Sequence, residues 1–191
     1  VEIVRDCDHG YVFEVPASAR ELVQAVPLRD MGRFEHEAAA VHDTSGVVYL
    51  TEDQWDSLFY RFLPNVPGEL HRGGRLQALA VQDKPSISTH NWQRQELPIG
   101  EVFQTRWIDL HDVDSSRNDL RHRGAADGAA TFARAEGLAV AGDRFAFTCT
   151  IGGPDRLGQI FTYKPSPFEG SAREQLAPGE LKLIAEATPD S

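Results

Sequence analysis

The 191-residue chain has only two cysteines and one methionine, and no apolar run long enough to cross a membrane. Two cysteines cannot supply the disulfide framework on which small secreted domains depend. We expect two free thiols, with a Cys7–Cys149 bridge as the alternative. A charged segment followed by an apolar stretch is also missing from the start of the chain, so no signal peptide is visible. This leaves the cellular compartment open.

Basic residues are scarce, with 19 Lys and Arg against 29 Asp and Glu, for a net charge of −10. Nucleic acid is therefore not expected as a partner, because phosphate backbones are bound by basic surfaces. The surplus of carboxylates suits hard cations, and the alternative is that it serves solubility alone. The hydrophobic fraction of 41% is ordinary for a globular protein. No linker divides the chain, so we predict a single domain, or part of one, over 1–191.

A repeat runs along the chain. Each copy has an alternating apolar segment that ends in proline, followed by a second alternating segment, and two copies extend upstream by two further short strands. Period-2 alternation indicates strands, and proline ends them because it cannot donate to a β-ladder. The proline-ended segments are 10–16, 58–64 and 159–165; the segments after them are 22–26, 75–81 and 180–186; the upstream strands are 37–41 with 47–51 and 136–140 with 144–148.

Four-stranded units of about 40–50 residues are typical of β-propeller blades. A jelly roll would also have many short strands, but not this repeat. We predict an all-β fold, a partial β-propeller of about three to four four-stranded blades. The chain is expected to be the middle of a longer propeller. The region 82–128, in which only 107–110 alternates like a strand, is predicted to form mainly surface loops.

Glu37 and Glu136 occupy the same position in two copies of the repeat, at the start of the first strand. First strands line the channel of a propeller, so equivalent carboxylates converge there. Their repulsion favours binding of a hard cation, and oxygen ligands suit Ca²⁺. The alternative is that each is a solvated residue at the beginning of its strand.

Three other groups accompany these glutamates. Glu52 and Asp53 follow the strand 47–51, as metal ligands or as a solvated turn. Arg134 lies two residues before Glu136, and we predict that both lie on one strand face. A guanidinium there could bind a phosphate with two hydrogen bonds, and a plain ion pair is the alternative. The three tryptophans are expected to pack in the core.

Several segments, in order along the chain, resemble the PhoX-type alkaline phosphatase family, and the resemblance covers nearly the whole sequence. The segments are DHGYVFEV (8–15), MGRFEHE (31–37), VYLTED (48–53), FYRF (59–62), GRLQAL (74–79), FARAEG (132–137) and FTCTIGG (147–153). The resemblance implies a bacterial β-propeller, exported to the periplasm or secreted, that hydrolyses phosphate monoesters with calcium and iron in its channel. It also implies a monomer when full length.

The resemblance assigns roles to the same residues. Arg134 would contact substrate as the catalytic residue, and Glu136, Glu37 and the pair Glu52 and Asp53 would bind metal, with Asp53 favoured over Glu52. Two family segments that carry further acidic and cysteine ligands are missing, one expected before residue 1 and one after 191. The metal site is therefore expected to be incomplete. The alternatives to an enzyme are a cation-stabilised propeller that acts as a binding module, and an exported propeller with a damaged site.

Overall fold

A computed structural model describes residues 9–189, and in them nine strands form one antiparallel sheet in the order β1-β2-β3-β4-β5-β9-β8-β7-β6. The strands are β1 (His36–Val41), β2 (Val48–Glu52), β3 (Phe59–Pro64), β4 (Gly74–Val81), β5 (Val102–Asp109), β6 (Ala135–Ala141), β7 (Arg144–Cys149), β8 (Gln159–Lys164) and β9 (Glu180–Glu186). Helices are short: α1 (Leu120–Ala126) and the 3₁₀ turns η1 (Arg29–Met31), η2 (Leu70–Arg72) and η3 (Glu174–Leu176). None of the described helices could span a membrane.

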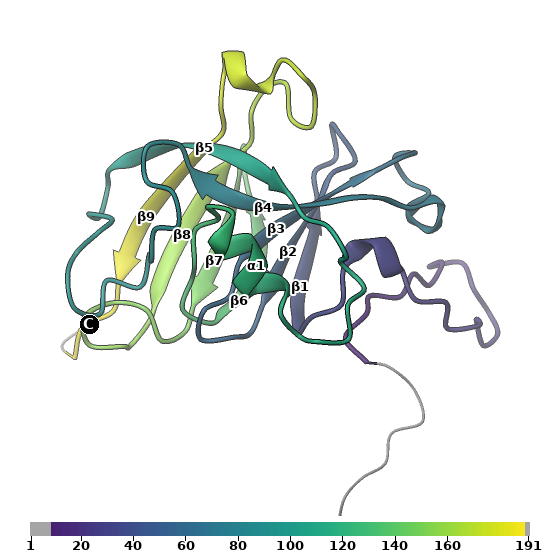
Figure 1. Ribbon diagram of the computed structural model, residues 1–191. Helices are drawn as coiled ribbons and strands as arrows, with labels where there is room; N and C mark the ends of the chain where they lie inside the picture. The colour runs from purple at the N-terminus through teal and green to yellow at the C-terminus, as the bar shows by residue number, and fades with distance from the viewer. Residues whose placement is uncertain (1–8, 190–191) are drawn as a thin grey trace, which may run out of the picture.

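Two four-stranded meanders, β1–β4 and β6–β9, make up most of the sheet, and β5 joins them by pairing with both β4 and β9. Figure 1 shows β5 crossing the top of the molecule above the two meanders. At the other side of the fold, the two end strands β1 and β6 lie against each other. The all-β prediction is confirmed, and each meander is a unit of the kind that forms a propeller blade.

The main core lies between the two meanders and is rich in aromatic rings. Tyr49 and Phe59 from the first meander pack with Phe147, Phe161 and Tyr163 from the second. A second core covers the other face of the first meander. All five residues of β2 are therefore buried, whereas burial alternates along β7. Both faces of the first meander are covered, and one face of the second remains open to solvent.

The predicted blade count is not confirmed, since the described residues contain two complete four-stranded units. The segments 10–16 and 22–26 are not strands; only an isolated bridge joins Phe13 to Pro27. Val15 and Leu22 are largely exposed, so this pair has no core to pack against. The alternating segment 107–110 is not part of a separate blade either, because it lies at the end of β5, which bridges the two meanders.

Candidate functional site

The two end strands of the sheet, β1 and β6, begin with the same irregularity. The register of β1 against β2 shifts between His36 and Ala39, and the register of β6 against β7 shifts at the equivalent place. Such bulges turn side chains out of the regular alternation. Glu37 and Glu136 each lie inside one of these bulges, so the repeat position predicted for them is also a shared structural position.

Matching threonines hold the two bulges. The hydroxyl of Thr51 accepts the Ala38 N–H at 3.0 Å, and that of Thr148 accepts the Gly137 N–H at 3.0 Å. The Thr51 hydroxyl also donates to the backbone carbonyl of Glu136 at 2.6 Å. This bond ties the first meander to the second where the two glutamates lie.

Arg134 precedes β6 in a left-handed conformation, with φ of 56°. Its N–H donates to the Gln54 carbonyl at 2.9 Å, and its own carbonyl accepts the Thr150 N–H at 3.0 Å. A non-glycine residue in this region is strained by about 1–3 kcal/mol, and such residues cluster at functional sites. The prediction that Arg134 shares a regular strand face with Glu136 is therefore wrong, because the chain turns at Arg134 before the strand starts.

The Arg134 side chain nevertheless meets the predicted acidic residues. Its Nε donates to Asp53 Oδ1 at 2.7 Å and its Nη2 to Asp53 Oδ2 at 2.9 Å, while Nη2 lies 3.3 Å from Glu136 Oε1. The hydrogen bonds that Arg134 donates to Asp53, and then the charge of Asp53, raise the Arg134 pKa, and the charges of Glu136 and Glu37 add to this. Four of the five predicted residues are thus brought together.

Three of these four side chains, those of Arg134, Glu136 and Glu37, retain polar atoms without a partner among residues 9–189. Asp53 occupies only the Nε and Nη2 edge of the guanidinium, so Nη1 is left unpaired. Glu136 accepts a hydrogen bond from the Thr150 hydroxyl at 2.6 Å through Oε1, which leaves Oε2 unpaired. Glu37 is exposed and has no hydrogen bond there. The cluster therefore presents both an open donor edge and open carboxylate oxygens.

Glu52 does not join the cluster. Its side chain is 1% exposed and accepts hydrogen bonds from the Tyr60 hydroxyl at 2.7 Å and the Leu58 N–H at 3.3 Å. Arg121 Nη1 lies 3.9 Å from its other oxygen. Successive residues of an extended chain point to opposite faces, so Asp53 reaches Arg134 while Glu52 enters the second core. Burial raises the Glu52 pKa from 4.5 to about 7.

This buried carboxyl should make stability depend on pH. The unfolded chain releases the proton at lower pH than the folded protein does, so the free energy of unfolding falls as pH rises from about 4.5 to about 7. The loss is on the order of 3 kcal/mol. Chemical denaturation at pH 5 and pH 8 should show wild type losing stability relative to Glu52→Gln, whereas the exposed Glu101→Gln control should follow wild type. Parallel pH dependence of wild type and Glu52→Gln would refute the assignment.

The described residues do not form a complete metal site, since no three His, Cys, Asp or Glu side chains within 9–189 are grouped to hold an ion. Both oxygens of Asp53 bond Arg134, and Glu52 is buried elsewhere. Of the four predicted metal ligands, Glu37 and Glu136 are the two that retain free carboxylate oxygens among the described residues.

Thr150 was not among the predicted site residues, yet its N–H bonds the Arg134 carbonyl and its hydroxyl bonds the Glu136 carboxylate. The repeat contained the signal. Thr51 is equivalent to Thr148, so Thr150 is equivalent to Asp53. The side chains at these equivalent positions bond the two site residues, Asp53 the Arg134 guanidinium and Thr150 the Glu136 carboxylate.

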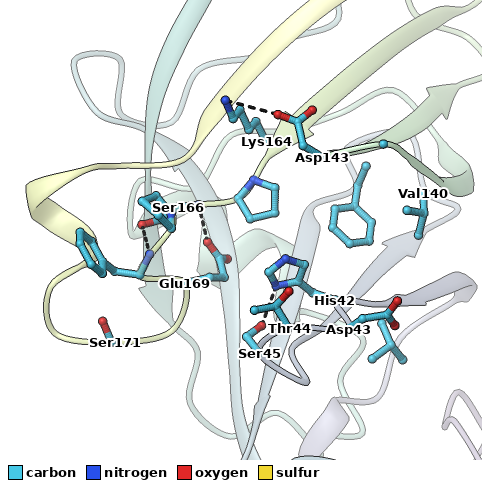
Figure 2. A pocket seen from close by; sticks show the side chains of 16 residues that line it. His42, Asp43, Thr44, Ser45, Val140, Asp143, Lys164, Ser166, Glu169 and Ser171 are labelled. Carbon is cyan, nitrogen blue, oxygen red and sulfur yellow. Dashed lines mark hydrogen bonds and ion pairs between the residues drawn. The ribbon is translucent and has the colours of Figure 1, made fainter.

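A cavity of about 750 Å³ lies where β1 and β6 end, at the opposite end of these strands from the Arg134 cluster. Figure 2 shows Lys164 near Asp143 on one side and His42 bonded to Ser45 on the other. Pro, Phe and Val side chains supply much of the remaining lining. None of the predicted site residues contributes to this cavity.

Comparison with known proteins agrees with this architecture. The family profile described as alkaline phosphatase PhoX matches residues 3–187. A solved structure, Pseudomonas fluorescens PhoX in complex with vanadate, a transition state analogue, is 22% identical and superposes with a TM-score of 0.60. The match covers 91% of this chain and 34% of that one, so the chain spans about a third of its length. Curated protein sequences give no significant match. Since the profile match extends over nearly the whole sequence, the chain belongs to the PhoX alkaline phosphatase family.

Proposed function

We propose that this chain carries part of the active site of a phosphatase that hydrolyses phosphate monoesters, with Arg134 binding the phosphoryl group. The observation that carries the proposal is the guanidinium itself. Asp53 fixes one edge of it through two hydrogen bonds, and Nη1 stays open. A donor held in place before substrate arrives stabilises charge that develops on phosphoryl oxygens at little reorganisation cost. Family membership supports the same chemistry.

The charge of the cluster supports a requirement for cations. Arg134 is surrounded by Asp53, Glu136 and Glu37, so the side chains sum to a negative charge that would repel a phosphate dianion. We propose that Glu37 and Glu136 contribute oxygens to bound Ca²⁺, with further ligands from outside residues 9–189. The resemblance also implies iron, and carboxylates are hard donors that bind either ion. Bound metal would polarise the phosphoryl group and neutralise its charge.

The remaining parts of the proposal rest on the resemblance and on the net charge of the chain. The substrate is a small phosphate ester, and nucleic acid is not expected because the chain is acidic. The full protein is proposed to act as a monomer in the periplasm or outside the cell.

Calcium binding and activity can be measured together on the full protein. It should hydrolyse p-nitrophenyl phosphate and lose activity in a chelator. At one hundred times its dissociation constant, Ca²⁺ should add about 2.7 kcal/mol to the free energy of unfolding. Glu136→Gln should lower bound calcium and remove most of that gain, whereas Glu101→Gln on an exposed loop should change neither.

Two results would point elsewhere. Calcium stabilisation without monoester hydrolysis would favour the binding module in place of the enzyme. An unchanged melting temperature in chelator would reject the cation site and, with it, the role of Glu136.

A further inference from the structure

All three tryptophans were expected to pack in the core, and Trp55 does not. Trp107 packs edge-to-face on Tyr163 at 5.5 Å and donates to its hydroxyl. Trp55, by contrast, is 56% exposed. It lies on a short turn between β2 and β3 that also includes Asp53. Its indole therefore has a ring face and edge open to solvent that a planar ligand can stack against.

Trp55 does not stand alone. Its ring lies 6.0 Å from that of Trp92, nearly perpendicular to it at 70°, and the guanidinium of Arg156 lies 4.6 Å from the Trp92 ring centre. His90 packs against Trp92 at 4.4 Å. We call Trp55, Trp92 and Arg156 the tryptophan platform. Arg156 and His90 cover part of the Trp92 ring. The indole surface that the platform exposes to solvent is therefore mainly that of Trp55.

Within the platform, Trp92 is held firmly, and Trp55 packs on it. The Trp92 indole N–H donates to the Ile151 carbonyl at 2.6 Å. Asn91, just before it, adopts φ of 56°, and its side-chain amide donates to the Leu97 carbonyl at 2.9 Å and to Glu186 at 2.7 Å. A cavity of about 210 Å³ opens beside Trp92 along residues 88–96. A rigid aromatic surface next to a hollow is suited to a flat ligand.

The same backbone segments hold the platform and Arg134. Asp53 accepts hydrogen bonds from the Arg134 side chain, and the Gln54 carbonyl accepts the Arg134 backbone N–H. Trp55 follows Gln54 directly in the chain. Two residues of extended chain span at most about 7 Å, so the Trp55 backbone lies close to Asp53. From the other side, Thr150 binds the Arg134 carbonyl, and its neighbour Ile151 binds Trp92.

We propose that the tryptophan platform binds the organic part of the substrate by stacking a planar ring on Trp55 while Arg134 holds the phosphate. This inference rests on the proposed phosphatase function and extends it to a substrate class. Phosphate monoesters that carry an aromatic ring, such as nucleoside 5′-monophosphates, are preferred over aliphatic ones. Stacking of a base on an aromatic side chain alters affinity by roughly 5- to 150-fold, and for a half-exposed indole we expect about 10-fold.

Adenosine 5′-monophosphate and glycerol 3-phosphate make a matched pair, because both release a primary alcohol and only the first carries a ring. In the full protein, Trp55→Ala should lower kcat/KM for the nucleotide about 10-fold and leave that for glycerol phosphate unchanged. Trp55→Phe should keep most of the preference, since it retains a ring. Ile99→Ala, which also removes an exposed apolar side chain, is the control and should change neither value.

An unchanged ratio in Trp55→Ala, or an equal fall for both substrates, would overturn the proposal. Binding of the nucleotide measured by quenching of tryptophan fluorescence tests the platform separately from turnover. If wild type hydrolyses neither ester, the proposed function fails. Nucleotide binding that is lost in Trp55→Ala would then still support the platform, and binding that is unaffected would reject it.

Discussion

Replacing Arg134 with alanine is expected to lower the turnover of a phosphate monoester by about 10²–10³, the usual effect of removing one preorganised donor from a developing oxyanion. Because a guanidinium cannot ligate a cation, calcium content should stay unchanged. Arg134→Lys should restore only part of the rate, since an ammonium lacks the two-pronged geometry that Asp53 holds in place. Arg75→Ala is the matched control, because that arginine is exposed and pairs with a single exposed carboxylate.

The comparison with Glu136 separates two roles within one cluster. Glu136→Gln should lose calcium, whereas Arg134→Ala should lose rate and keep calcium. If Arg134→Ala releases the metal, or leaves the rate untouched, then the pairing with Asp53 is only a structural ion pair.

Replacing Arg61 with methionine should strongly lower the free energy of unfolding. Arg61 is 2% exposed on β3, where its Nε donates to Gln77 at 2.7 Å and its Nη1 to Glu169 at 2.6 Å. It also pairs with Glu174 and lies 4.5 Å from the centre of the Trp107 ring. These bonds fasten the connection between β8 and β9 onto the first meander. Removing one partner of a buried ionic network costs about 3–5 kcal/mol, because the other charge stays buried.

Urea denaturation would measure this loss. Arg75→Met on the neighbouring strand, at an exposed ion pair, should change the free energy of unfolding by less than about 1 kcal/mol. Adding Glu169→Gln to Arg61→Met should recover part of the stability, since it neutralises the carboxylate left behind. A loss below about 1 kcal/mol in Arg61→Met would show that the network contributes little to the fold.

The strands of both meanders could be predicted from the sequence to within a residue or two at most ends. Their alternation reports which side chains face the core between the meanders, as Tyr49 and Phe147 do. The repeat also put Glu37 and Glu136 at equivalent positions, and the two bulges share those positions. Local pattern was sufficient there because each strand's neighbours follow it directly in the chain.

Other features depend on contacts between distant segments, which alternation does not encode. The segment 10–16 alternates like a strand but has no continuous partner to pair with. β5 belongs to both meanders because its two ends pair with different strands. The left-handed backbone of Arg134 is imposed by bonds to Gln54 and Thr150, and no residue type signals it.

The divergence of Glu52 from Asp53 is a similar case. Two adjacent carboxylates after a strand look equivalent in sequence. Glu52 is buried in the second core and bonds Tyr60, whereas Asp53 bonds Arg134. Trp55 likewise looks like a core residue by composition, yet its turn carries it to the surface.

Inhibition by vanadate tests the central claim, that Arg134 acts on the phosphoryl group in the transition state. Vanadate is bound as a transition state analogue in the Pseudomonas fluorescens PhoX structure. Removal of an interaction that is made in the transition state should weaken binding of such an analogue by the same factor by which it lowers kcat/KM. Across wild type, Arg134→Lys and Arg134→Ala, the inhibition constant for vanadate should therefore rise in proportion to the fall in kcat/KM. A fall in kcat/KM with an unchanged inhibition constant would contradict the claim.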